Sequence, residues 1–136
     1  MSGEKQSVTC FLESNNEILI LLRSERVSTY KDTWGGISGA IDKGKTADEQ
    51  AILEIEEETG LSGQDVQLLR RGQPLVFYDR QFGVRKVIYP YLFHAKDREK
   101  IRTDWEHTEA KWIAFADIDK YRTMPKLKET LALVLG

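Results

Sequence analysis

The sequence has few of the residues that mark specialised protein classes. Of its 136 residues, one is cysteine and three are proline. A single cysteine, Cys10, allows no internal disulfide and suits a reducing compartment, and we expect it to be a small residue in a strand. No apolar run reaches the roughly 18 residues that a membrane-spanning helix needs. The first ten residues lack the apolar core of a signal peptide, so we expect a cytoplasmic protein with no membrane partner.

An excess of positive charge is also absent. Twenty Lys and Arg residues stand against 22 Asp and Glu residues, for a formal net charge of −2 at pH 7. This balance argues against attraction of the whole surface to nucleic acid or to an anionic membrane. Hydrophobic residues make up 40% of the chain and charged residues 31%, which is typical of a globular protein. The length predicts one domain over residues 1–136.

The hydrophobic pattern predicts an α+β fold, a mixed β-sheet with helices packed on its faces. We expect Pro90 to mark an edge or a bulge, because proline cannot donate to a strand ladder. A Ser14-Asn15-Asn16 turn joins the first two strands, since asparagine tolerates left-handed backbone. The predicted strands cover 6–13, 17–23, 66–71, 74–79, 84–95 and 110–115, and the predicted helices cover 46–59 and 125–135.

The helix over 46–59 has clear signals at both ends. Thr46 with Glu49 three residues later forms a capping-box pattern, and Gly60 suits the left-handed position after the last turn. Its predicted apolar face consists of Ala51, Ile52, Ile55 and Thr59.

Three glutamates on this helix indicate chemistry. Glu54, Glu57 and Glu58 stand at i, i+3 and i+4, which places their side chains on one face. From residue 46 to 69 there are seven acidic residues and no Lys or Arg, so salt bridges within the segment cannot explain the cluster. A solvated acidic face is the simpler alternative. A divalent cation would instead remove the mutual repulsion, and oxygen ligands on a rigid helix suit Mg²⁺ or Mn²⁺.

The spacing around this helix resembles a known family. The family's motif is the Nudix box, G-x5-E-x7-R-E-U-x-E-E-x-G-U, in which U is apolar. This chain matches the motif at Gly39, Glu54, Ile55, Glu57, Glu58, Gly60 and Leu61. The resemblance extends to Trp34-Gly35-Gly36 before the box and to the stretch from Glu106 to Ile113 after it.

The resemblance implies an α/β/α sandwich and hydrolysis of a phosphoanhydride in a nucleoside diphosphate linked to another group. It assigns Glu54, Glu57 and Glu58 as ligands of Mg²⁺ or Mn²⁺, with the Gly39 carbonyl as a further ligand. Glu54 is the first candidate to position or deprotonate the attacking water. Because some members use an acid from a later loop, Glu106 and Glu109 are alternatives.

Two positions depart from the box. Lys45 stands where the family has its first Glu, and Leu53 stands where it has Arg. Because both members of that family ion pair are missing together, neither leaves a stranded charge. The departure raises a second function, a catalytically weakened Nudix domain that binds a nucleotide or a protein partner as a sensor. A Nudix-related isomerase has less support, since no Cys and His pair lies near the Gly-rich segment.

The substrate itself is weakly encoded. We expect a small nucleotide as the substrate. The oligomeric state stays open, although many members of the family pair as homodimers. The basic candidates for phosphate contacts are Arg23, Arg26, Lys31 and Lys45, and the aromatic candidates for base stacking are Tyr30, Trp34, Phe77 and Tyr78. We expect Trp105 and Trp112 to be packing residues and His107 to lie exposed in a loop.

Overall fold

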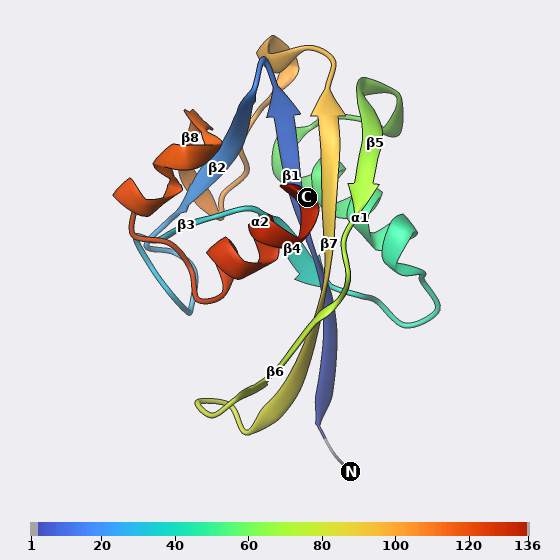
Figure 1. Cartoon of the computed structure of the whole chain (residues 1–136), viewed down its shortest axis with the longest axis vertical. Coiled ribbons are helices and arrows are strands. Elements are labelled where there is room, and N and C mark those ends of the chain that lie inside the picture. Colours follow the sequence, from blue (N-terminus) through green and yellow to red (C-terminus); the bar gives the residue numbers. More distant parts are fainter. Residues whose placement is uncertain (1–2, 136) are drawn as a thin grey trace.

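The computed structural model describes residues 3–135, an eight-stranded mixed sheet with one α-helix on each face (Figure 1). The sheet runs in the order β3-β2-β1-β7-β5, with β4 paired to β1, β6 to β7 and β8 to β2. The helices are α1 (Ala47–Thr59) and α2 (Leu127–Leu135). The strands are β1 (Glu4–Ser14), β2 (Glu17–Arg23), β3 (Trp34–Gly35), β4 (Ile37–Ala40), β5 (Val66–Arg71), β6 (Leu75–Asp79), β7 (Val84–Ala95) and β8 (His107–Ala114).

This architecture confirms the predicted α+β sandwich. The two predicted α-helices and six predicted strands are all present, and the Gly-rich segment adds the short strands β3 and β4. Asn15 and Asn16 have φ of 52° and 63°, as the predicted turn between β1 and β2 requires. The pattern did not reveal three short 3₁₀ helices, at Gly63–Asp65, Arg98–Lys100 and Phe115–Lys120. In the described part of the chain, no helix is long and apolar enough to cross a bilayer.

The core lies in two layers because side chains alternate along the central strands. On β1, Val8, Cys10 and Leu12 point to the layer under α1, whereas Phe11 points to the layer under α2. In β2, the residues of the α1 layer are Leu19 and Leu21, and those of the α2 layer are Ile18 and Ile20. Cys10 is buried in β1, as expected.

Pro90 does not lie at an edge or a bulge, so that prediction is wrong. It lies inside β7, which pairs in parallel with β1 on one side and with β5 and β6 on the other. The partner strand changes at this point, since Arg71 of β5 lies opposite Tyr91 and Leu75 of β6 lies opposite Ile88. The Pro90 carbonyl accepts from Gly72 N at 2.9 Å, and the missing proline N–H costs the sheet nothing in this gap.

The hairpin of β6 and β7, with the start of β1, projects below the body as an arm (Figure 1). Side chains alternate along β6, so Phe77 is half-buried while its neighbours Val76 and Tyr78 are 47% and 62% exposed. The inner side of the arm therefore faces the body and leaves room for a pocket beside α2.

Candidate functional site

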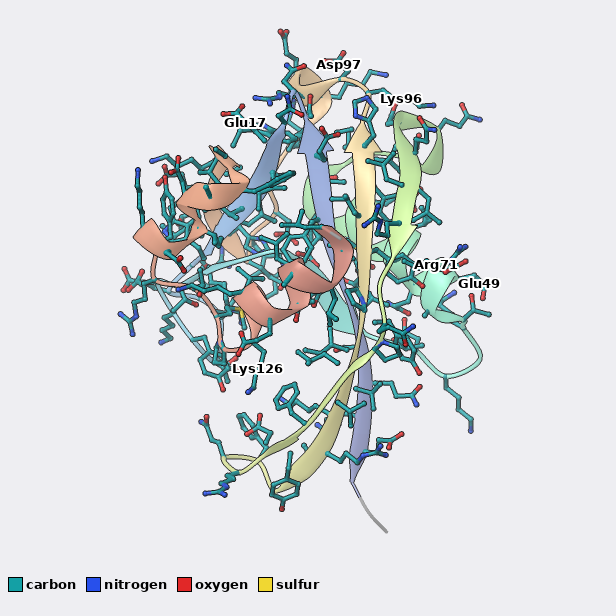
Figure 2. The ribbon with its side chains drawn as sticks, viewed as in Figure 1. Glu17, Glu49, Arg71, Lys96, Asp97 and Lys126 are labelled. Atoms are coloured by element: carbon teal, nitrogen blue, oxygen red, sulfur yellow. The ribbon has the colours of Figure 1, made fainter. Side chains whose placement is uncertain are left out.

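The first turn of α1 is fixed in place by a cap and by contacts to the sheet. Thr46 Oγ1 accepts from Glu49 N at 3.1 Å, and Glu49 Oε1 accepts from Thr46 N at 2.9 Å, which confirms the predicted capping box. Gly60 ends the helix with φ of 76°. Tyr91 OH donates to Asp48 at 2.6 Å, and Arg71, beside the start of α1 in Figure 2, also binds Asp48. These contacts hold α1 on the sheet although the family's ion pair is replaced by Lys45 and Leu53.

Glu54 is half-buried against the backbone of Gly39. A methyl group at position 39 would overlap the Glu54 carboxylate, so only glycine allows this approach. Gln50 Nε2 donates to Glu54 Oε2 at 2.7 Å, and Gln50 Oε1 in turn accepts from Asp42 N at 2.9 Å. Burial raises the pKa of Glu54, and the charges of Glu57 and Asp42 raise it further. The loop before α1 thus orients one carboxylate of the predicted cluster.

Glu58 is the most deeply buried of the three box glutamates, at 3% exposure. Its Oε2 atom has no hydrogen-bond partner within residues 3–135, and its Oε1 atom lies 3.8 Å from His107 Nε2. Burial, and then the nearby Glu54, raise the pKa of Glu58 to about 10. Two carboxylates can only accept, so the pair needs a shared proton or a bound cation to be satisfied.

A turn from Asp104 to His107 closes the site from the other side. Burial raises the pKa of Glu106, and the neighbouring Asp104 charge adds to the shift, while Glu54 is also close enough to contribute. His107 is buried, with Nδ1 3.1 Å from Asp104 Oδ1, and burial lowers its pKa. The expectation of an exposed loop histidine is therefore wrong, because this residue begins β8 and packs beside Glu58.

The three predicted glutamates differ in burial in the structure. Glu54 and Glu58 turn inward together, whereas Glu57 is exposed to solvent. Across residues 3–135, no three His, Cys, Asp or Glu side chains are grouped as a metal site would need. Glu58 lies one helical turn after Glu54, whereas Glu57 is displaced from Glu58 by about 100° around the helix axis. The helix spacing therefore places the three on one broad face without making their carboxylates converge.

The two loop acids are also separated. Glu106 is half-buried beside Glu54 and Glu58. Glu109 is exposed on β8 opposite Leu22, and no hydrogen bond or ion pair among the described residues links it to the cluster.

A pocket of about 290 Å³ opens next to Gly39, between the arm and the start of α2. Lys126 projects from the beginning of α2 toward the arm (Figure 2), with its Nζ 5.3 Å from the Phe77 ring centroid. Tyr30 closes another side, and its OH donates to Gln81 Oε1 at 3.2 Å. Lys5, Lys86 and Lys126 all line this pocket, and Lys86 pairs with Asp79 at 2.7 Å. An aromatic ring among lysines suits an anionic ligand with a planar group.

Of the predicted substrate residues, Tyr30 and Phe77 line this pocket, whereas the four basic candidates, Trp34 and Tyr78 do not. Arg23 Nε donates to Thr29 O at 3.2 Å, and Tyr78 points away from Phe77 on the outer side of the arm. Arg26 lies over Trp105, while Lys31 and Lys45 are exposed. Sequence reasoning missed Lys5, Lys86 and Lys126, since only the approach of β1, β7 and α2 in space brings them together. Alternation along β6 is the one signal that could have separated Phe77 from Tyr78.

Comparison with known proteins agrees with the family resemblance seen in the sequence. Residues 3–134 match the family model described as the NUDIX domain. The chain therefore belongs to the Nudix family, which confirms the family that the box predicts.

One curated relative is an RNA pyrophosphohydrolase of Sphingopyxis alaskensis. It is 38% identical over 55 residues, which is 40% of this chain and 35% of that protein.

Solved structures share the fold at low identity. A MutT protein from Methanosarcina mazei Go1 has a TM-score of 0.79 at 19% identity, over 96% of this chain and 92% of that one. An Ap4A hydrolase binary complex from C. elegans has 0.73 at 18% identity, over 96% and 93%. A bifunctional NMN adenylyltransferase/ADP ribose pyrophosphatase from Francisella tularensis, complexed with AMP and a Mn ion, has 0.83 at 19% identity, over 99% and 42%.

Proposed function

We propose that this protein is a divalent-metal-dependent hydrolase that cleaves a phosphoanhydride bond in a nucleoside diphosphate linked to another group. The observation that carries the proposal is the buried Glu58 beside the half-buried Glu54, with one Glu58 oxygen left without a partner among residues 3–135. A buried carboxylate without a cation or a proton is costly, and structural proteins rarely retain one.

The residues present fit Mg²⁺ or Mn²⁺. Glu54, Glu57 and Glu58 offer the carboxylate oxygens that these ions prefer, and the backbone of Gly39 adjoins the Glu54 carboxylate. When bound, such an ion neutralises diphosphate charge, polarises a phosphoryl oxygen and lowers the pKa of water. The Mn ion in the Francisella tularensis complex supports this choice of cation.

We assign the proton transfer to Glu106. It lies half-buried on a separate turn close to Glu54, and burial raises its pKa, which makes it a stronger base than an exposed glutamate. Glu54, our first candidate, already accepts a hydrogen bond from Gln50, so its role is to hold the cation. In the pocket, Phe77 stacks against the planar part of the nucleotide while Lys126 moves to its phosphates.

The second candidate function is nucleotide sensing without turnover. The replacement of the family's Glu and Arg by Lys45 and Leu53 is the observation that favours it. A sensor would keep metal-dependent nucleotide binding and lose hydrolysis.

Phosphate release from a panel of nucleoside diphosphate derivatives, with Mg²⁺ or Mn²⁺, separates these functions. We expect turnover in the wild type and a loss in kcat of at least about 100-fold in Glu58→Gln and Glu57→Gln. Glu56→Gln is the matched control, since Glu56 is an exposed glutamate of the same helix. Glu106→Gln should lower kcat but leave Mn²⁺ affinity unchanged.

Metal-dependent nucleotide binding without turnover would favour the sensor. Full turnover in Glu58→Gln would contradict the site.

A further inference from the structure

Gln50 is a polar residue buried in α1. Its side chain is 1% exposed, whereas the preceding residues Asp48 and Glu49 lie at the surface. A buried amide is costly unless its oxygen and its nitrogen both have partners. Fixing a long glutamine side chain also lowers its conformational entropy. The buried neighbours Ala51 and Ile55 are apolar, so packing alone does not explain a glutamine here.

Both ends of the Gln50 amide have partners, and these come from two different segments. Gln50 Nε2 donates to Glu54 Oε2 at 2.7 Å, and Gln50 Oε1 accepts from Asp42 N at 2.9 Å. The partners fix the orientation of the amide, because an ionised carboxylate can only accept and a backbone N–H can only donate. One side chain therefore connects the proposed cation ligand Glu54 to the loop between β4 and α1.

This loop, residues 41–46, contains a tight turn. Lys45 N donates to Asp42 O at 3.0 Å and closes the turn, and Gly44 at its third position has a φ of 87°, where glycine is favoured. The N–H group that Gln50 binds belongs to Asp42, the first residue of this turn. Gln50 thus holds the beginning of the turn against α1.

The junction between loop and helix has no ion pair at the two departures from the box. Lys45 is exposed, and Leu53 is half-buried and has no polar atom in its side chain. Gln50 lies on α1 between these two positions, three residues before Leu53. Its amide makes a contact between loop and helix that needs neither of the two charges.

We propose that Gln50 is a positioning residue that performs the task of the missing ion pair. It holds the turn at Asp42 against α1 and keeps the Glu54 carboxylate beside the Gly39 backbone, ready to bind a cation. This inference rests on the proposed function and adds a residue to its cation site. A ligand whose rotamer is already fixed loses less conformational entropy when a cation binds, so Gln50 raises the affinity for the cation.

Gln50→Met tests this role, because methionine fills a similar volume and has no amide. In calorimetric titration with Mn²⁺, we expect a Kd at least about tenfold higher than in the wild type. Turnover should return when the Mn²⁺ concentration is raised by the same factor, with kcat within about threefold of the wild type. Gln67→Met is the matched control, since Gln67 is an exposed glutamine of β5.

Hydrogen exchange at Asp42 gives a readout that needs no metal. In the metal-free wild type, the Asp42 amide should exchange slowly although the residue itself is exposed. In Gln50→Met, it should exchange at least about tenfold faster. The amides of β1 and α2 should keep their rates, which excludes a general loss of folding.

Restoring the family's ion pair tests whether the two contacts can replace each other. Lys45→Glu and Leu53→Arg together should change the Mn²⁺ Kd of the wild type by less than about threefold. The same two changes should recover most of the affinity lost in Gln50→Met, because they supply a second contact between loop and helix.

Three results would overturn the inference. They are a Mn²⁺ Kd in Gln50→Met within about twofold of the wild type, an unchanged exchange rate at Asp42, or an equal effect of the restored pair with and without Gln50. Each of these leaves wild-type turnover dependent on Mn²⁺ and sensitive to Glu58→Gln. Failure of the proposed function would instead make wild-type turnover independent of Mn²⁺ and insensitive to that change.

Discussion

The two helices that cover the sheet differ in what they bury. In α2, the buried residues are Leu127, Thr130, Leu131 and Val134, which complete an apolar layer with β1 and β2. In α1, Gln50 and Glu58 are buried alongside Ala51, Ile55 and Thr59. One helix therefore stabilises the sheet, whereas the other carries polar groups into the interior at a cost in stability.

Most of this cost in stability comes from Glu58. Its carboxylate is almost fully removed from water and one oxygen has no partner among the described residues, so ionisation opposes folding. The metal site proposed at α1 would explain why such a group is retained. Because α2 has no such group, substitutions in the two helices should change stability in opposite directions.

The largest effect is expected from Leu131→Ala in α2. Leu131 is 2% exposed, and its truncation leaves a cavity that should lower the free energy of unfolding by about 2–5 kcal/mol. Urea denaturation measures the loss, and kcat below the unfolding transition should not change. Leu135→Ala, at a residue 37% exposed, is the control and should cost far less. A fall in kcat without a loss of stability would contradict this account, because α2 would then contribute to catalysis rather than to stability.

Glu58→Gln in α1 should have the opposite effect. Without metal, the variant should be more stable than the wild type by about 1–2 kcal/mol, because folding of the wild type at neutral pH has to protonate Glu58 whereas glutamine needs no proton. Saturating Mn²⁺ should stabilise the wild type by about 2–3 kcal/mol at 100 times its Kd, and this gain should be lost in the variant. Thermal unfolding with and without Mn²⁺ measures both, with Glu56→Gln as control. A less stable metal-free variant would count against the buried-charge account.

The pH dependence of stability follows from the same group. The pKa of Glu58 is about 10 in the folded protein and near its ordinary value of 4.5 when unfolded, so between these values folding takes up a proton and stability falls as pH rises. Between pH 7 and 8.5, above the titration of His107, the metal-free protein should lose up to about 1 kcal/mol per pH unit. Urea denaturation at several pH values measures the slope. A slope unchanged in Glu58→Gln would show that another group causes it.

The smallest effect is expected at the cap of α1. Thr46→Ala removes the hydrogen bond to Glu49 N and should lower the free energy of unfolding by about 1 kcal/mol. Thr46→Ser keeps the acceptor and should be close to the wild type. Chemical denaturation compares them, and equal losses in both variants would mean that the hydroxyl does not act as a cap.

Local signals in the sequence predict much of the fold. Thr46, Glu49 and Gly60 define the bounds of α1, and β7 extends over the predicted 84–95. The position of Pro90 could not be predicted, because the change of partner strand depends on residues far away in the chain.

The site was predictable in part. The box identifies the glutamates, but helix spacing alone does not show that Glu58 is buried while Glu57 is exposed. Nor does the sequence show that Trp105 is 56% exposed, since its surroundings come from the loop after β2. The expectation that Trp105 is a packing residue is therefore wrong.

Anomalous diffraction from crystals soaked in manganese chloride and a nucleotide tests the central claim most directly. The account predicts a manganese peak within bonding distance of the Glu54 and Glu58 carboxylates, next to the bound phosphates. A nucleotide in the pocket with no manganese beside those two side chains would contradict it.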